Sequence, residues 1–487
     1  MRTRLALLLV PLSLGSQLPG CSRELAFTAQ GISAGGSEDI RYATEIIEGG
    51  GIPNEESFTT EGLMSEHDLP VDGEDCSEVL CPRAAVASID PIDGSGRQLL
   101  LQLGFGTIYS SEPFERQPLR VALAVDVSGS MSGGKLDAVK DALRVMLDQL
   151  DEGDEMALIA FDDEAWVEEP MTVMNERGLE RMARAIDRLE VDGGTSIEAG
   201  LTLAYAEVAP EAGAAGVEDR VMLFSDAQPN VDATGMDSFV GMATYYAEAG
   251  IGTSVFGVGL DMGSELANII SKTRGGNYYF LADEEEIRQV FDEEFDSIVS
   301  PVAYDLRVNL GPTEGLSFSA GYGVPLDGPD VELGASTLFL SSRNGGMGAT
   351  LVAAEGQELP ASGQVASMTL SYVPVDGVSE EQRLDASWEG GNTYTSATIL
   401  ADDLGVFKMG VLIDAYLALK AGSDFCFGSL SQDEALARVD AATGHVDEVA
   451  LTLDDAPLAE LAVLLGTLAA NIEVGTERCQ AADSYAY

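Results

Sequence analysis

Five side chains with oxygen donors occur in three separated stretches of the chain. Asp126, Ser128 and Ser130 lie in DVSGSMSGGK, which directly follows an apolar run. Thr195 lies in DGGTSI and Asp226 in LFSDAQPN. Two carboxylates and three hydroxyls are hard donors of the kind that suit Mg²⁺, with Mn²⁺ or Ca²⁺ as alternatives. The residues therefore predict a divalent-metal site if the three stretches meet.

The spacing and the hydroxyl donors within DVSGSMSGGK favour recognition of a protein partner through a metal over hydrolysis of a substrate. A tight turn, permitted by the glycines, can direct both serine hydroxyls to one point. Hydroxyls are weak donors to a cation, so the ion would keep an open position for a carboxylate from another molecule. The plain alternative is that the aspartate and the serines only cap a turn or a helix.

The elements around these stretches predict how they meet. Between Arg120 and about Ser300, short and continuously apolar runs alternate with amphipathic helical segments. This pattern is typical of an α/β fold with a doubly wound, mostly parallel sheet, in which AWVEEPM forms a short edge strand. Ligands bind such folds outside the carboxyl ends of the strands, and Asp126 and Asp226 both follow a predicted strand.

The combination DVSGSMS, GGTS and FSDAQPN resembles the metal-ion-dependent adhesion site of von Willebrand factor type A (VWA) domains, over residues 119–300. The resemblance implies that Asp126, Ser128, Ser130, Thr195 and Asp226 form the metal site, with the two serines as direct ligands. One departure is Ala227, where relatives usually have glycine, and we expect it to alter the loop geometry without loss of the metal.

Other segments frame this domain. Residues 39–118 are predicted to form a helical segment followed by strands. Residues 301–398 are predicted to form a β-sandwich-like domain, and residues 399–487 a helical region. The strand predicted at Arg97–Ser110 could join the sandwich, which would make the α/β domain an insertion. The flanks loosely resemble bacterial lipoproteins that carry one VWA domain.

The N-terminus predicts export and lipid anchoring. Positive charge, the apolar stretch LALLLVPLSLG and LPGC resemble a bacterial lipoprotein signal over residues 1–20, with Cys21 as the lipidated residue. The alternative is an ordinary cleaved signal with a chance cysteine. Residues 21–38 then read as a flexible tether. Ser22 after the cysteine favours the outer membrane, with the periplasmic or surface face undecided. No later segment reaches ~18 uninterrupted apolar residues, so we expect the lipid to be the only membrane contact.

Four cysteines remain after Cys21. Their even number in an exported chain favours disulfides, and proximity favours Cys76–Cys81 and Cys426–Cys479 among the three possible pairings. Zinc is the alternative, but no CxxC occurs in the chain.

The charge balance limits the partners. With 82 acidic and 26 basic residues the net charge is −56, which repels nucleic acid and anionic lipid head groups. An acidic exported protein and a protein from a salty habitat both fit this composition.

These features together predict a lipid-anchored envelope protein that binds an unknown protein partner through a metal site, with the partner supplying an Asp or Glu carboxylate. The first alternative is a structural envelope protein whose metal only stabilises its own fold. The second is a hydrolase, but GISAG lies in the predicted tether, and neither His67 nor His445 falls within the α/β domain. We therefore do not expect an enzyme.

Overall fold

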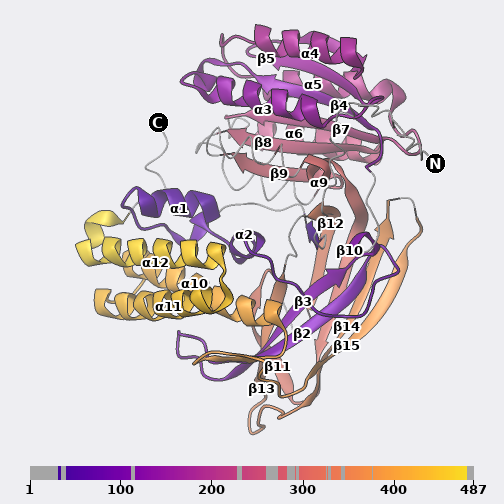
Figure 1. Ribbon diagram of the computed structural model, residues 1–487. Coiled ribbons are helices and arrows are strands. Elements are labelled where there is room, and N and C mark those ends of the chain that lie inside the picture. Colours follow the sequence, from indigo (N-terminus) through magenta and orange to yellow (C-terminus); the bar gives the residue numbers. More distant parts are fainter. Residues whose placement is uncertain are drawn as a thin grey trace, which may run out of the picture.

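The computed structural model describes residues 31–34, 40–110, 116–226, 233–258, 273–281, 291, 295–324, 326, 331–341, 346–375 and 377–479. An α/β unit, a β-sandwich and a helical layer make up this part of the chain (Figure 1). The predicted signal, Cys21 and Ala227 lie outside the described residues.

The α/β unit is built on one six-stranded sheet in the order β6-β5-β4-β7-β8-β9. All neighbouring pairs are parallel except β5 with β6, which are antiparallel. The predicted edge strand AWVEEPM is therefore correct. The strands are β4 (Leu119–Asp126), β5 (Glu155–Phe161), β6 (Ala165–Val173), β7 (Glu218–Ser225), β8 (Ile251–Val258) and β9 (Gly276–Leu281).

Helices cover both faces of this sheet because its central strand is apolar on both sides. Val121, Leu123 and Val125 of β4 share a core with α3 (Lys135–Gln149) and α4 (Glu176–Arg188). Ala122 and Ala124 face the other core, which contains α5 (Ile197–Val208) and α6 (Ala233–Glu248). The doubly wound α/β fold expected from the sequence is thus present.

The β-sandwich takes strands from both sides of the α/β unit along the chain. One sheet has the order β1-β12-β10-β14-β15 and the other β11-β13-β3-β2-β17-β16. Pairing of β3 with β13 joins the strand that precedes the α/β unit to one that follows it, so the α/β unit is an insertion in the sandwich. The strands are β1 (Gly31–Ala34), β2 (Cys81–Ile89), β3 (Gln98–Gly106), β10 (Pro301–Pro312), β11 (Leu316–Tyr322), β12 (Val331–Ser341), β13 (Met347–Ala353), β14 (Gly363–Pro374), β15 (Glu380–Trp388), β16 (Tyr394–Thr395) and β17 (Ile399–Ala401).

Two sequence expectations need correction here. Residues 31–34 of the predicted flexible tether form β1, which pairs with β12 and gains backbone hydrogen bonds there. Residues 399–401, expected to open the helical region, form β17 and pair with β2. Both segments are short, so their pairing depends on distant strands and leaves little local pattern.

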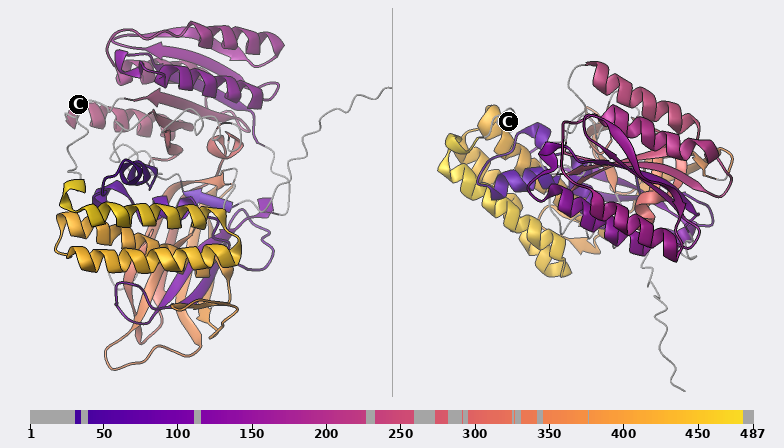
Figure 2. Two further views of the ribbon diagram at one scale, coloured as in Figure 1. Left: turned by 60° about the vertical axis from the view of Figure 1, so that its left-hand side comes forward. Right: turned by 90° about the horizontal axis from the view of Figure 1, so that it is seen from above.

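The helical layer packs against the sandwich. Its helices are α1 (Ile40–Glu48), α2 (Thr60–Ser65), α10 (Leu404–Phe427), α11 (Gln432–Leu453) and α12 (Ala456–Val474). Figure 2 shows the three long C-terminal helices stacked beside α1, which comes from the opposite end of the chain. One described helix, α12, is long and apolar enough to cross a membrane. Its buried leucines pack instead into the core that it shares with α10 and α11.

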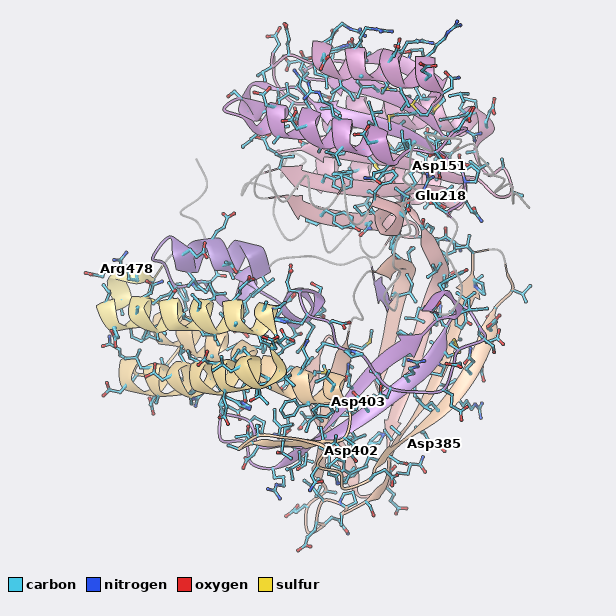
Figure 3. All side chains as sticks on the ribbon, viewed as in Figure 1. Asp151, Glu218, Asp385, Asp402, Asp403 and Arg478 are labelled. Atoms are coloured by element: carbon cyan, nitrogen blue, oxygen red, sulfur yellow. A yellow bond between two sulfur atoms is a disulfide. The ribbon has the colours of Figure 1, made fainter. Side chains whose placement is uncertain are left out.

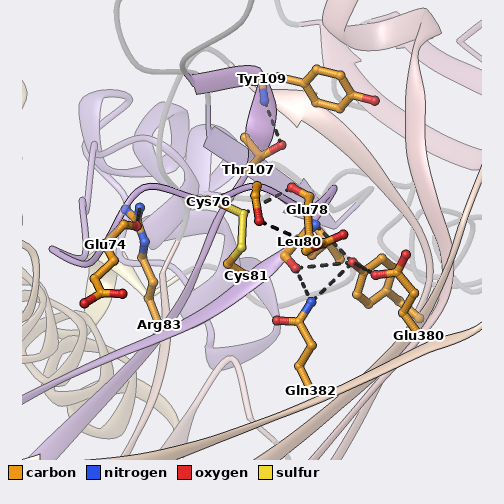
Figure 4. Close-up of a disulfide and its surroundings, with 12 residues drawn as sticks. Glu74, Cys76, Glu78, Leu80, Cys81, Arg83, Thr107, Tyr109, Glu380 and Gln382 are labelled. Atoms are coloured by element: carbon orange, nitrogen blue, oxygen red, sulfur yellow. Dashed lines mark hydrogen bonds between the residues drawn. A yellow bond between two sulfur atoms is a disulfide. The ribbon is translucent and has the colours of Figure 1, made fainter.

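Both expected disulfides are present. Cys76–Cys81 lies at the start of β2, next to the carbonyl of Leu80, which accepts hydrogen bonds from Gln382 and Tyr372 of the facing sheet (Figure 4). Cys426–Cys479 joins the end of α10 to the segment after α12. The predicted pairing by proximity is confirmed.

Candidate metal centre

The two carboxylates predicted to bind the metal emerge at the same edge of the α/β sheet. Asp126 is the last residue of β4, and Asp226 directly follows β7. These strands are parallel neighbours, with Val125 paired to Phe224 (Figure 1). Because the carboxyl ends of parallel neighbours meet, both side chains reach the position where such sheets bind ligands.

A chain of hydrogen bonds connects four of the five predicted residues. The Ser128 amide donates to Asp126 Oδ1 at 2.8 Å. The hydroxyls of Ser128 and Ser130 lie 3.0 Å apart. Ser130 Oγ then donates to Asp226 Oδ1 at 2.8 Å. Both serines therefore point to the same place as the two carboxylates.

The loop that carries Thr195 lies against this group. Gly129 N donates to Gly193 O at 3.1 Å, and Asp192 N donates to Val127 O at 2.8 Å. These two bonds hold the loop beside the serine turn, and half-buried Thr195 follows Gly193 by two residues. The structure thus brings together the three stretches that the sequence placed far apart.

Glycine is required where this loop passes the end of β5. Gly193 has φ +68°, and a Cβ there would lie 2.9 Å from the Asp162 carboxylate. A Cβ on Gly194 would meet the Asp163 carboxylate, to which the Gly194 amide donates at 3.1 Å. Asp162 itself accepts a hydrogen bond from Glu164 N, as an aspartate in a turn commonly does. The GG pair therefore allows the loop to approach the site.

The five candidate ligands do not all have the same exposure to solvent. Asp126 is fully buried and Ser128 is 1% exposed, whereas Ser130 is exposed at the surface. Asp226 is 3% exposed. The site therefore has a buried floor and one side open to solvent, so a molecule outside the protein can reach it.

The electrostatics of the floor favour a cation. Burial raises the pKa of Asp126, and the neighbouring Asp226 carboxylate raises it further. Hydrogen bonds from Ser225 and Ser128 act in the opposite direction and lower the pKa. Two buried carboxylates at close range repel each other, and a bound positive charge would relieve that repulsion.

Two further residues of this site were not assigned from the sequence. Ser225 Oγ donates to Asp126 Oδ2 at 2.5 Å and fixes the floor carboxylate. Lys135 Nζ lies 2.6 Å from Asp226 Oδ2. Lys135 ends the stretch DVSGSMSGGK and Ser225 precedes Asp226, but neither spacing shows that these side chains turn into the site.

The donor set fits a hard divalent ion. Among the described residues, no three His, Cys, Asp or Glu side chains cluster so as to hold a metal, so this candidate depends on two carboxylates helped by hydroxyls. The ammonium of Lys135 against Asp226 shows that a positive charge is accommodated there. Asp126, Ser128, Ser130, Thr195 and Asp226 would hold a small cation that prefers oxygen ligands.

Comparison with known proteins identifies the class of the α/β unit. Residues 121–293 match the family model of the von Willebrand factor type A domain. The chain contains a VWA domain, and domains of this type typically mediate protein–protein interactions.

Individual relatives are distant. An uncharacterized protein of Synechocystis sp., sll0103, is 28% identical over 237 residues, covering 47% of this chain and 52% of that protein. A solved VWA protein from Catenulispora acidiphila covers 77% of this chain and 88% of its own, at 16% identity and TM-score 0.47. The mussel byssus protein PTMP1 was solved with zinc in its MIDAS motif, the metal-ion-dependent adhesion site. Its match covers 37% of this chain and 46% of the PTMP1 chain, at 17% identity and TM-score 0.32.

Proposed function

We propose that this protein is a lipid-anchored component of a bacterial cell envelope, on the outer membrane, that binds a protein partner through a divalent metal. The metal is Mg²⁺, with Mn²⁺ or Ca²⁺ as alternatives, held by Asp126, Ser128, Ser130, Thr195 and Asp226. The partner contributes an Asp or Glu carboxylate. Anchoring at Cys21 and envelope location follow from the N-terminal sequence alone.

The observation that carries this proposal is the continuous polar path from buried Asp126 to exposed Ser130. Its members come from two strand ends and one turn, and they are joined by hydrogen bonds of 2.8–3.0 Å. If these side chains only capped turns or helices, the residues at the ends of two different strands would have no need to contact one another. The open side at Ser130 gives an outside molecule access to it.

Each residue has a distinct part in the proposed binding. A bound divalent ion would supply positive charge at the surface of a very acidic protein and a position for the partner carboxylate. The buried Asp126 and Asp226 would supply the negative charge that retains the ion. Ser128 and Ser130 would contribute neutral oxygens, which leave the ion attractive to an incoming carboxylate.

The proposal can be tested by retention of envelope proteins on the immobilised full chain. We expect a partner to be retained with Mg²⁺, to elute with chelator and to be absent on the Asp126→Ala variant. Asp137→Asn changes an exposed acidic residue at the start of α3 and serves as the matched control. Retention that is equal with Mg²⁺ and with chelator would contradict metal-mediated binding.

A structural staple is the alternative, and heat stability separates it from a binding module. Removal of a metal that only joined the loops would lower the melting temperature by several degrees, because ligand binding to the native state stabilises it. Such a shift without any partner that depends on metal would favour the staple. A metal-dependent partner together with an unchanged fold of Asp126→Ala favours the binding module.

One observation bears on the hydrolase alternative. His445 Nδ1 lies 2.9 Å from Asp414 Oδ2, and His445 Nε2 lies 2.8 Å from Ser396 Oγ. These are the contacts of a Ser-His-Asp triad. However, the Ser396 oxygen also accepts from the amides of Thr398 and Ile399, at 3.4 and 3.2 Å.

A structural role explains this array better. Ser396 lies in the turn between β16 and β17, Asp414 on α10 and His445 on α11. Asp414 Oδ1 also accepts from Ile92 N at 3.1 Å, so the array joins four separate segments. The two amide donors engage the lone pairs with which a serine nucleophile would attack.

An activity-based fluorophosphonate probe tests this assignment. We expect no labelling of Ser396 in the intact protein, because its oxygen is already engaged by amide donors. Ser396→Ala and His445→Gln should leave the labelling pattern unchanged. Labelling that disappears in both variants would contradict the structural role and favour a hydrolase.

A further inference from the structure

Lys135 occupies the position of a cation within the candidate metal site. Its ammonium lies 2.6 Å from Asp226 Oδ2, while the other oxygen of that carboxylate accepts from Ser130 at 2.8 Å. The Asp226 side chain is 1% exposed and that of Lys135 is 29% exposed. The lysine therefore reaches inward from the open side of the site.

The requirements of helix α3 do not explain why a lysine stands at position 135. Lys135 is the first residue of α3, where the positive end of the helix dipole disfavours a cation. Lysine is also scarce in this acidic chain, and occurs only at 135, 140, 272, 408 and 420. Its place is explained by Asp226, because a buried carboxylate without a positive partner is costly.

A divalent ion and this ammonium cannot share Asp226 without cost. Two positive charges on one carboxylate repel each other, and the repulsion is strong where the site is shielded from water. The lysine stem is flexible and nearly a third of the side chain is in solvent, so the ammonium can leave. Ser130, Ser128 and Asp126 would remain in place.

We propose that Lys135 is a built-in counter-ion that holds the site when no metal is present and must be displaced when a divalent ion binds. This inference rests on the proposed metal-binding function and deepens it. Lys135 sets the concentration of divalent ion at which the site fills. It also protects the metal-free site from repulsion between its two buried carboxylates.

Calorimetric titration of the full chain with Mg²⁺ tests the affinity part of this inference. Lys135→Met keeps an unbranched side chain of similar reach but removes the charge, so we expect its dissociation constant to fall at least tenfold relative to wild type. Lys140 lies on the same helix, about 7.5 Å further along its axis, and Lys140→Met should match wild type. Equal or weaker Mg²⁺ binding by Lys135→Met would overturn the inference.

Lysine acylation read by mass spectrometry tests displacement directly. In wild type, we expect the acylation rate of Lys135 to rise several-fold on addition of Mg²⁺, with the rate at Lys140 unchanged. An unchanged rate at Lys135 while calorimetry detects bound Mg²⁺ would overturn displacement and leave the metal site intact. If neither wild type nor Lys135→Met binds Mg²⁺, the proposed function itself fails.

Discussion

At the residue scale, half-buried Glu218 and buried Arg220 show how the α/β unit tolerates charge away from its candidate metal site. Arg220 is fully buried and lies 2.9 Å from Glu218 Oε1 through Nη1. Its Nη2 donates to Gly275 O at 2.9 Å, and its guanidinium lies 5.2 Å from the Phe339 ring centre in β12. Arg220 thus links β7 to the sandwich, and Figure 3 shows Glu218 in the α/β unit.

The raised pKa of Glu218 predicts that the free energy of unfolding depends on pH. Burial raises its pKa from 4.5 to about 7, although Arg220 acts to lower it. Because the folded state binds the proton more tightly than the unfolded state, this residue favours folding below pH 4.5. That contribution is lost as the pH rises from 4.5 to about 7, and it stays lost above.

Glu218→Gln removes this titration. As the pH is raised from 5 to 8, we expect the melting temperature of Glu218→Gln to rise relative to that of wild type. The corresponding change in the difference between their unfolding free energies is about 1–3 kcal/mol, since one pKa unit is worth about 1.4 kcal/mol. Scanning calorimetry at both pH values measures it. Glu190→Gln, at an exposed site, is the control. A difference between wild type and Glu218→Gln that is constant with pH would contradict the raised pKa.

At the element scale, the patterns that predicted correctly were local ones. Continuous apolarity identified β4 and β7, and the edge strand predicted at AWVEEPM is β6. The residues after β4 and β7 followed from topology, because parallel strands end at one edge. This is why Asp126 and Asp226 could be placed together without a structure.

The features that the sequence did not reveal depend on distant contacts. Helix α10 continues past Gly422 to Phe427, although glycine often ends a helix. Gly422 is used for close packing, since a Cβ there would lie 3.2 Å from Leu468 of α12. Lys135 and Ser225 were visible as residues, but their contacts to Asp226 and Asp126 exist only once β4 and β7 pair.

The two disulfides should differ in their contribution to stability. Cys426–Cys479 closes a sequence separation of 53 residues and Cys76–Cys81 a separation of 5. Loop-closure entropy then gives about 4 kcal/mol for the first and about 2 kcal/mol for the second. Thermal melting of the two double Cys→Ala variants measures the difference. An equal or larger loss for Cys76→Ala/Cys81→Ala would contradict the entropic account.

At the scale of the whole molecule, the edge that carries the candidate metal site is one local feature of a strongly anionic protein. With a net charge of −56, the surface repels an acidic partner at long range, and salt screens that repulsion. A cation at the open edge of the α/β sheet would provide local attraction. The insertion of the α/β unit between β3 and β10 gives it two chain connections to the sandwich, which supports a defined placement of this edge.

The proposed anchor predicts where the whole molecule is found. Radiolabelled palmitate supplied to expressing cells should be incorporated into wild type and should be lost in Cys21→Ser. The unlabelled variant should move from the membrane fraction to the soluble fraction, because several acyl chains on one residue give stable membrane attachment. Membrane association that persists unchanged in Cys21→Ser would contradict lipid anchoring.

The central claim is that Asp126, Ser128, Ser130, Thr195 and Asp226 hold one divalent ion. Titration of the full chain with Mn²⁺, followed by electron paramagnetic resonance at physiological salt, tests it most directly. We predict one tight Mn²⁺ site per chain, displaced by excess Mg²⁺ and absent from correctly folded Asp126→Ala and Asp226→Ala variants. Wild type without a tight site, or variants that bind Mn²⁺ as wild type does, would contradict it.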